Sequence, residues 1–486
     1  MAVEEALKKI VGSEYFFDDE EILKQYSMDY STVSPRMPTY VVKPKDVKEI
    51  QEVVKLANKW KIPIVPCSSG VHFYGTTIPR LGGIIVDLRR MNRILKIDER
   101  NRNVMIEPGV TWEQLQSELK KYQLRALNPL LPHISKSVLT SHLEREPMLI
   151  PKFEYSEPIL TMEVVLPTGE ILRTGAASVL NARSPNVITD LCNPYGPGLD
   201  FFRLFQGAQG ALGIVTWVNV KVEYLPVVQK IYFVSFRRIE DVIEPIYRIQ
   251  RRRIGDECLV LNNFNLANIL TRKWPGDFKA LRESLPPFTM ILVLAGGRRR
   301  PEEKIKYEEE ALMKICSELQ LNISSTLPGA PTETEALMLE LLRSHWPEEP
   351  YWKFRYKGSC QDIFFIATLN KIAKFSEAVH RLATRIGYPK MDIGYYLQPL
   401  ENGRVAHCEF NFFYNPFDKK EVECMRKLYI EAVELLTNMG AFFSRPYGDA
   451  AKIIYSRCAA YITALKKVKS IFDPNYIMNP GVLGVL

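Results

Sequence analysis

The chain contains no apolar run long enough to cross a bilayer, although 46% of its 486 residues are hydrophobic. A membrane-spanning helix needs about 20 consecutive apolar residues. The first 25 residues are acidic and helix-periodic, and they lack the basic start and apolar stretch of a secretory signal. We therefore expect no transmembrane segment and a cytoplasmic location.

Cysteine is sparse and dispersed, which argues against a disulfide framework. The chain has eight cysteines, and no two of them have the C-x-x-C spacing of metal or redox sites. Thiols scattered through a large chain fit a reducing cytoplasm. The cysteines are Cys67, Cys192, Cys258, Cys316, Cys360, Cys408, Cys424 and Cys458.

Signals for the usual NAD site and for nucleic-acid binding are also missing. The G-x-G-x-x-G motif of the dinucleotide-binding fold is absent. The net charge is +8, and the densest basic runs, 251–253 and 298–300, have no interleaved aromatic residues. These arginines either end solvated helices or loops, or form a docking face for an acidic redox partner. No nucleic-acid partner is expected.

The length and the order of the predicted elements indicate more than one domain. A chain of 486 residues exceeds the size of a single hydrophobic core. Residues 38–88 read as strands around an amphipathic helix that begins at Asp46, and a hairpin turns at Pro167 to Gly169. From about residue 230, a new set of strands and long helices predicts a second α+β domain, and a helix near 451–470 follows it.

The loop after the strand that ends at Cys67 is the first candidate binding site. Residues 66–75 read PCSSGVHFYG, and such small residues allow a chain to wind tightly. Tight winding points several backbone N–H groups into one concavity, as the binding of a pyrophosphate requires. The loop alone has low specificity, because many surface turns have this composition.

The order of several segments is much more specific. The chain reads PRLGGIIVDL, IEPGVT, MEVVLPTGE, GALGIVT and finally DPNYIMNPG. In this order the segments closely resemble the vanillyl-alcohol oxidase and p-cresol methylhydroxylase superfamily, over most of residues 35–225 and 430–486. The resemblance implies an α+β, PCMH-type FAD-binding fold. It implies an FAD-binding domain over 1–225, an α+β cap domain over the flavin at 226–435, and a return to the first domain over 436–486.

The resemblance also implies which residues bind FAD. One group surrounds the pyrophosphate, a second lies along the cofactor, and Asn479 closes the site. The alternatives are a β-bulge at Gly213 and a C-terminal turn at Asn479. The implied cofactor residues are Pro66, Cys67, Ser68, Ser69, Gly70, Val71, His72, Gly75, Ser137, Gly210, Gly213, Ile214, Val215 and Asn479.

Two segments, PRLGGIIVDL and LEREP, resemble sequences of the 4-cresol dehydrogenase-like branch, which oxidises para-alkylphenols. In that branch a loop tyrosine and a Tyr-Arg pair surround the phenolate oxygen. Tyr74 and Arg445 match, but Ser444 replaces the second tyrosine, and Tyr447 is the nearest substitute. A guanidinium and a phenol lower the pKa of a bound phenol, and the phenolate releases hydride more readily. Alternatively, Tyr74 is an aromatic lid and Arg445 clamps a phosphate or carboxylate.

His407 is the histidine with the most consequential position among the six in the chain. The resemblance places it near the point where some family members attach FAD covalently. It is therefore a covalent tether, a proton acceptor near the substrate, or a hydrogen-bonded histidine on a cap strand. Its neighbours lack the second histidine of the metal-dependent hydroxy-acid dehydrogenases, so we expect no metal.

The stretch 133–145 departs from the family pattern. This segment normally runs beneath the flavin ring and is rich in glycine, but here it contains none. Bulky residues either bring new polar groups to the ring, namely His133, Lys136 or His142, or they weaken flavin binding. The second outcome would leave a degenerate subunit.

These observations predict an FAD-dependent oxidoreductase with Tyr74, Arg445, Tyr447 and His407 at its catalytic centre. Its substrate is expected to lose hydride from an activated C–H bond, such as the benzylic carbon of a para-alkylphenol. The alternatives are an FAD-dependent 2-hydroxy-acid dehydrogenase and a non-catalytic flavoprotein-like subunit of a heteromeric complex. The expected partners are the small substrate, an electron-carrier protein and a second subunit, as in a dimer.

Overall fold

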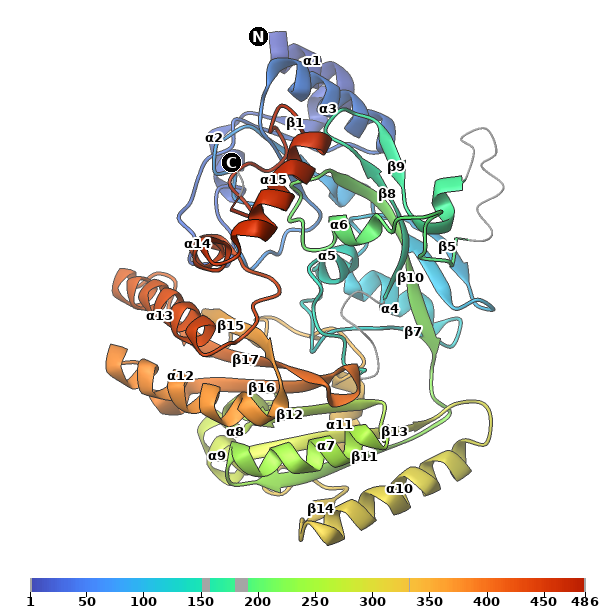
Figure 1. The fold of residues 1–486 in the computed structure, drawn as a ribbon, viewed down its shortest axis with the longest axis vertical. Helices are drawn as coiled ribbons and strands as arrows, with labels where there is room; N and C mark the ends of the chain where they lie inside the picture. The colour runs from blue at the N-terminus through green and yellow to red at the C-terminus, as the bar shows by residue number, and fades with distance from the viewer. Residues whose placement is uncertain (1, 151–157, 180–190, 332, 485–486) are drawn as a thin grey trace.

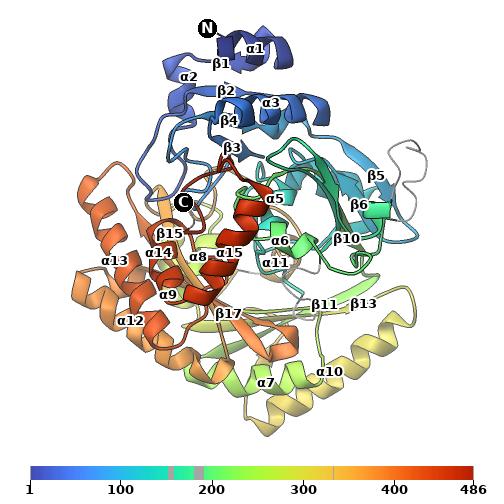
Figure 2. The same ribbon diagram turned by 45° about the horizontal axis from the view of Figure 1, so that its top comes forward.

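Three β-sheets and the helices around them make up the computed structural model, which describes residues 2–150, 158–179, 191–331 and 333–484. Figures 1 and 2 show the first two sheets together at one end and the third sheet across the other end. The mixture of helices and strands confirms the predicted α+β class. None of the described helices is both long and apolar enough to span a bilayer.

The first sheet has four strands in the order β1-β2-β4-β3, and β2, β4 and β3 are parallel. The predicted helix after β2 is confirmed, and the Asp46 carboxylate caps it by accepting from the N–H groups of Lys48 and Glu49. Its apolar face packs on the sheet. The elements are α1 (Ala2–Val11), β1 (Phe16–Phe17), α2 (Glu20–Gln25), β2 (Tyr40–Val42), α3 (Val47–Trp60), β3 (Ile64–Cys67) and β4 (Ile84–Asp87).

The second sheet is antiparallel, with the order β5-β6-β10-β8-β9, and β7 also pairs with β10. The predicted hairpin is confirmed as β8 and β9, since the Gly169 N–H donates to Leu166 O in the turn. The elements are β5 (Ile94–Asp98), β6 (Asn103–Ile106), α4 (Trp112–Lys120), β7 (Leu124–Ala126), α5 (Val138–Leu143), β8 (Ile159–Val165), β9 (Ile171–Arg173), α6 (Phe202–Phe205) and β10 (Ile214–Tyr224).

The third sheet has seven strands in the order β14-β11-β13-β12-β16-β17-β15. Helices α7, α10, α12 and α13 pack on its outer face, and α8, α9 and α11 pack on the face toward the first two sheets. The elements are β11 (Val228–Phe236), α7 (Ile243–Arg251), β12 (Glu257–Asn262), α8 (Asn263–Leu270), α9 (Phe278–Ser284), β13 (Phe288–Gly296), α10 (Pro301–Glu318), β14 (Ile323–Ser324), α11 (Thr334–Leu341), β15 (Ser359–Ala367), α12 (Ile372–Ile386), β16 (Ile393–Leu400), β17 (Val405–Tyr414) and α13 (Lys419–Asn438).

The last residues return to the first sheet, as the ribbon shows (Figure 1). Here the prediction of one helix near 451–470 is wrong, because the chain forms α14 (Gly448–Ser456) and α15 (Ala459–Phe472). The N–H groups of Arg457 and Cys458 bond carbonyls three residues earlier, which tightens the end of α14. Beyond α15, Met478 pairs with Ile64 at the edge of β3. The C-terminal segment thus lies beside the loop that follows β3.

Candidate active site

The loop after β3 is held in shape by its own side chains and by the N-terminal segment. The Asp29 carboxylate accepts from the Gly75 N–H at 2.7 Å. Gly75 has φ +73°, and a Cβ there would lie 2.5 Å from a methyl carbon of Val33. The His72 ring lies with Nε2 2.7 Å from Ser69 O. Burial lowers the pKa of His72 to about 4, so the ring is neutral and donates its Nε2–H to this carbonyl.

The backbone amides of this loop are available to an anion. Within the described ranges, the N–H groups of residues 69–74, 76 and 77 make no hydrogen bond to a backbone carbonyl. Asn479 connects the loop to the opposite wall, because its Nδ2 donates to Thr76 O at 2.8 Å and to Gln209 O at 2.6 Å. Backbone N–H groups that the fold leaves to other acceptors are the donors that a pyrophosphate requires.

A cavity of about 100 Å³ separates the loop from the turn that precedes β10 and from α5. The two walls meet where the hydroxyls of Ser68 and Thr140 contact each other. The wall at Gly210 admits no side chain, since a Cβ there would lie 2.5 Å from Pro66 Cγ. Of the predicted cofactor residues, those that line this cavity are Pro66, Ser68, His72, Gly210, Gly213, Ile214 and Val215.

The other predicted cofactor residues lie around this cavity without lining it. Cys67, Ser69 and Gly70 line a second cavity of about 350 Å³ on the far side of the loop. Ser137 caps α5 through the Thr140 N–H and donates to Pro108 O at 2.6 Å. Its side chain therefore fixes α5. The remaining residues that do not line the cavity are Val71, Gly75 and Asn479.

The glycine-free stretch forms a turn and the short helix α5. Lys136 is 3% exposed, and its Nζ lies 3.0 Å from Glu144 and 2.5 Å from Glu146. Burial alone would lower the pKa of Lys136. The two acids have the larger effect and keep the Lys136 pKa above its usual value. His142 instead packs its ring edge against Trp112. Of the polar groups predicted at the ring, His133 and Lys136 line the cavity described next, and His142 does not.

That cavity, here called the ring cavity, has a volume of about 50 Å³. It lies between the segments that flank α5, the third sheet and the segment before α14. It brings together Tyr74 and Arg445 with residues from three strands of the third sheet. Its lining residues are Phe73, Tyr74, Pro129, Leu130, Pro132, His133, Lys136, Glu146, Pro147, Tyr351, Trp352, Lys353, Asp362, Tyr396, Glu409 and Arg445.

Aromatic contacts fix the predicted substrate-binding pair. Tyr74 stacks on Tyr447 with centroids 4.5 Å apart and an interplanar angle of 8°. The Arg445 guanidinium lies over the Phe364 ring at 4.1 Å. Burial raises the pKa of both tyrosines, so both keep their hydroxyl protons at neutral pH. The fold thus places Tyr74, Arg445 and Tyr447 together, with Tyr447 behind Tyr74.

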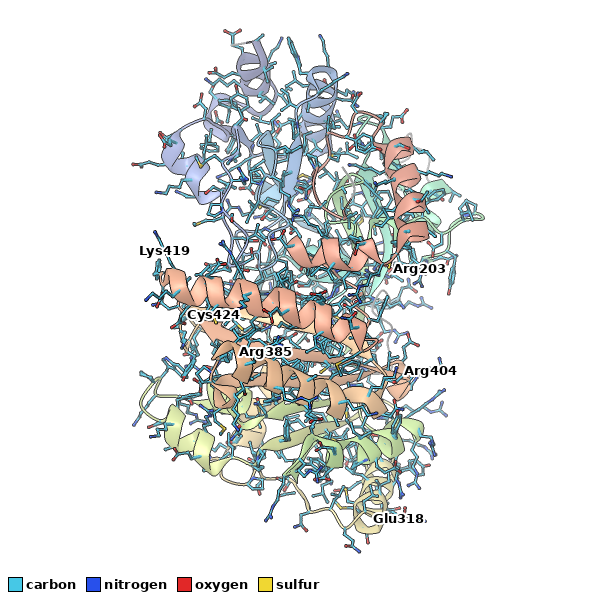
Figure 3. All side chains as sticks on the ribbon, turned by 60° about the vertical axis from the view of Figure 1, so that its left-hand side comes forward. Arg203, Glu318, Arg385, Arg404, Lys419 and Cys424 are labelled. Carbon is cyan, nitrogen blue, oxygen red and sulfur yellow. The ribbon has the colours of Figure 1, made fainter. Side chains whose placement is uncertain are left out.

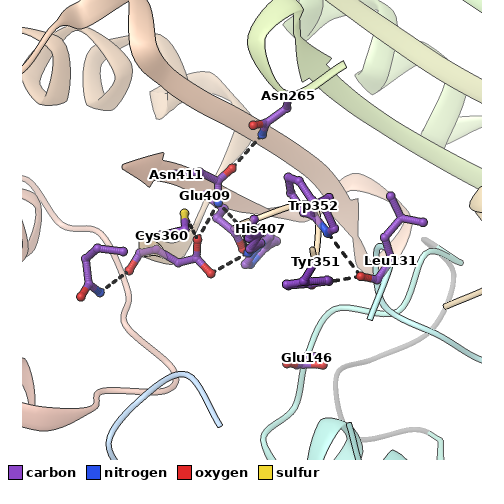
Figure 4. Close-up of polar contacts among 12 residues, drawn as sticks. Leu131, Glu146, Asn265, Tyr351, Trp352, Cys360, His407, Glu409 and Asn411 are labelled. Carbon is purple, nitrogen blue, oxygen red and sulfur yellow. Dashed lines mark hydrogen bonds and ion pairs between the residues drawn. The ribbon is translucent and has the colours of Figure 1, made fainter. Parts of the chain in front are cut away.

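A buried charge network on the third sheet was missed by sequence reasoning. Lys353 Nζ lies 2.5 Å from Asp362 and 2.7 Å from Glu409. Asn411 Nδ2 donates to both acids, at 2.6 and 2.7 Å, and Asn265 in turn donates to Asn411 (Figure 4). The available signal was a pair of acids within the otherwise apolar strands SCQDIFFIA and VAHCEFNFFY. Charged residues in buried strands are rare unless paired.

His407 belongs to this network and does not line the ring cavity. Its Nε2 lies 3.1 Å from Glu409 Oε2, and its side chain is 1% exposed. Burial lowers the pKa of His407, so the neutral ring donates to Glu409. Burial would raise the Glu409 pKa, but Lys353 and His407 outweigh it and lower that pKa. At Asp362 the effect of burial is larger than that of Lys353, so the pKa of Asp362 is raised.

Comparison with known proteins gives two family matches. Residues 38–175 match the FAD binding domain, and residues 225–483 match the C-terminal domain of FAD linked oxidases. The glycolate oxidase subunit GlcD of Bacillus subtilis is 25% identical over 99% of this chain and 96% of its own. The 4-cresol dehydrogenase flavoprotein subunit of Pseudomonas putida is 31% identical over 45% of this chain and 41% of its own.

Solved structures share the fold. Substrate-bound p-cresol methylhydroxylase matches with a TM-score of 0.85 at 18% identity, over 100% of this chain and 96% of its own. The 4-ethylphenol oxidase of Gulosibacter chungangensis matches with a TM-score of 0.84 at 20% identity, over 100% and 97% of the two chains. The PCMH-type fold expected from the sequence is confirmed.

Proposed function

Because the chain belongs to the FAD-linked oxidases, and is therefore an FAD-dependent oxidoreductase, we propose that its substrate is a para-alkylphenol that loses hydride from its benzylic carbon. The observation that carries the proposal is the meeting of Tyr74 and Arg445 in a cavity with aromatic walls. Tyr351, Trp352 and Tyr396 also line it, and flat apolar faces of this kind suit an aromatic ring. FAD, when bound, would supply the acceptor for this hydride.

Tyr74 and Arg445 would bind the phenol oxygen. Tyr74 remains protonated, so its hydroxyl donates to that oxygen. Arg445 is 4% exposed, and a guanidinium in so dry a site stabilises a phenolate more strongly than it does in water. Stacking against Tyr447 holds the Tyr74 ring in place. The two groups together favour the electron-rich phenolate from which hydride leaves.

Asp362 would accept the phenol proton, because it lines the ring cavity and its pKa is raised by burial. A base must be unprotonated to act, so kcat/KM for the phenol is expected to fall as the pH is lowered through this raised pKa. An ordinary aspartate has a pKa of about 3.9, so the fall in kcat/KM should begin at a higher pH than such a group would give. Asp362→Asn should remove this acidic limb, whereas the exposed control Asp449→Asn should keep it. An unchanged pH profile in Asp362→Asn would assign the proton to another acceptor.

The amides of His72, Thr76 and Thr77, which line the cavity, would hold the pyrophosphate of FAD, and Ser68 and Thr140 would donate to it from the two walls. The hydroxyl contact of these two residues spans the cavity, so FAD must separate them. We expect Thr140→Val to weaken FAD binding about tenfold, the value of one hydrogen bond to a charged group. Thr140→Ser keeps the hydroxyl and should bind as the unaltered protein does. FAD is titrated into the apoprotein of each variant. Equal dissociation constants for Thr140→Val and Thr140→Ser would contradict a role of the Thr140 hydroxyl in FAD binding.

His407 would position Glu409 and would not carry a covalent flavin. Its Nε2 is engaged with Glu409, and the ring is buried behind the wall of the ring cavity. Acid precipitation of the purified protein should therefore release all of the flavin into the supernatant. Flavin that stays with the precipitate and is lost in His407→Asn would show a covalent tether instead.

A 2-hydroxy acid is the second candidate substrate. Relatives that match nearly the whole chain include proteins named as D-lactate and D-2-hydroxyglutarate dehydrogenases. In that case Arg445, with Lys136 and Lys353 nearby, would bind the carboxylate. Anaerobic titration of the holoenzyme separates the two: 4-ethylphenol should bleach the visible flavin band and D-lactate should not. Bleaching by D-lactate alone would select the second candidate.

A further inference from the structure

A large apolar groove lies on the surface, apart from the ring cavity. It has a volume of about 430 Å³, within the range of small-molecule sites. The groove, here called the α15 groove, lies between α6, the segment 442–446, α14 and α15. Arg203, at its edge, is labelled near the lower end of α15 in Figure 3.

The walls of the α15 groove are aromatic and aliphatic. Phe442 and Tyr461 are 64% and 65% exposed, and they face the groove together with Tyr455. Along α15, the groove-lining positions Tyr461, Ala464, Leu465 and Val468 recur at helical spacing. Leu465 and Val468 also pack partly on core residues, whereas Tyr461 and Ala464 are exposed, so the outer part of this apolar stripe is open in the groove.

Polar and cationic side chains also line the α15 groove. Arg145 and Gln206 line it, and no Asp or Glu is among the lining residues in the described part of the chain. The Arg145 Nη2 donates to Ser444 O at 2.6 Å. Gly207 leaves room for this guanidinium, since a Cβ there would lie 2.7 Å from Nη2. Donors beside aromatic walls fit a ligand whose ring carries acceptor oxygens.

The α15 groove and the ring cavity share a wall. Ser444 and Pro446 line the groove, while Arg445 between them lines the ring cavity. The same holds at Arg145, which lines the groove. The residue before it, Glu144, pairs with Lys136, and Lys136 lines the ring cavity. A ligand in the groove is therefore separated from the oxidation site by the thickness of one segment of chain.

From these features we propose that the α15 groove binds a quinone, which serves as the electron acceptor of the oxidation. The aromatic walls hold the quinone ring, and Arg145 and Gln206 face its carbonyl oxygens. The overall reaction balances: the donor loses two electrons and two protons, and the quinone gains both and becomes a quinol. This proposal rests on the oxidoreductase function but not on the identity of the donor.

The test uses the holoenzyme, ubiquinone-1 and a pair of variants on α15. Ala464 lines the groove, whereas Ala460 is exposed and does not. Ala464→Trp should fill the groove and weaken ubiquinone-1 binding at least about tenfold by calorimetry, with Ala460→Trp unchanged. Reoxidation of the reduced enzyme by ubiquinone-1 should slow in parallel, while anaerobic bleaching by the donor stays the same in both variants.

The outcomes distinguish this inference from the proposed function. Absence of ubiquinone-1 binding, or equal binding by Ala464→Trp and Ala460→Trp, would overturn the inference. Tight binding of decanoate without binding of ubiquinone-1 would also overturn it, and would make the groove a site for anionic lipids. If no donor bleaches the flavin, the proposed function fails, yet calorimetry still decides whether the groove binds the quinone.

Discussion

Replacing Arg445 with alanine is expected to lower kcat/KM for a para-alkylphenol by about 10³-fold while FAD remains bound. The guanidinium is buried over Phe364 and lines the ring cavity with Tyr74. Loss of a preorganised group that stabilises developing charge typically costs a factor of about 10² to 10³. Stopped-flow bleaching of the oxidised enzyme by 4-ethylphenol measures the effect without interference from the electron acceptor.

Two further variants control this experiment. Arg445→Lys keeps the positive charge but loses the planar guanidinium, so it should recover only part of the rate. Arg404→Ala removes an arginine whose side chain is 82% exposed, and it should leave the rate unchanged (Figure 3). A rate in Arg445→Ala within about twofold of the original would remove Arg445 from the substrate site.

Replacing Lys353 with methionine is expected to destabilise the fold by about 3–5 kcal/mol, the cost of removing one partner from a buried ion pair. Asp362 and Glu409 would then lie buried without their shared cation. Both acids would have pKa values above those of the unfolded chain, so the penalty should be largest at neutral pH. It should shrink as the pH falls and the carboxyls take up protons.

Urea unfolding at about pH 5 and pH 7.5 tests this, because protonation of a buried carboxyl lies between these conditions when its pKa is raised. The control is Lys357→Met, on the same segment, whose pair with Glu421 is about one-third exposed at each side chain. An exposed pair contributes roughly 0–1 kcal/mol. Equal losses in the two variants, or a larger loss for Lys353→Met at the lower pH, would contradict the network's proposed role in stability.

The half of the site that we propose to bind phosphate was accessible from the sequence because its signals are local. Asp46 marks the start of a helix, and Cys67 ends a strand before a loop of small residues. Local spacing also indicated the hairpin at Gly169. The domain boundaries at 225 and 435, and the expected pairing with another subunit, stay predictions.

The ring half was less accessible because its parts meet only in three dimensions. Lys353, Asp362 and Glu409 lie on separate segments, and the pairing of β15 with β17 brings the two acids to one face. The break between α14 and α15 has no glycine or proline to mark it. That the glycine-free stretch brings new polar groups to the flavin ring stays a prediction, and the pairing of Lys136 with Glu144 and Glu146 was not visible in the sequence.

Hydride should leave the benzylic carbon of a phenol held by Tyr74 and Arg445. The test is anaerobic stopped-flow bleaching with para-cresol deuterated only at its methyl group. We expect bleaching to slow markedly relative to para-cresol, whereas ring-deuterated para-cresol should react at the ordinary rate. Equal rates for all three compounds, or bleaching by D-lactate and by none of them, would contradict this expectation.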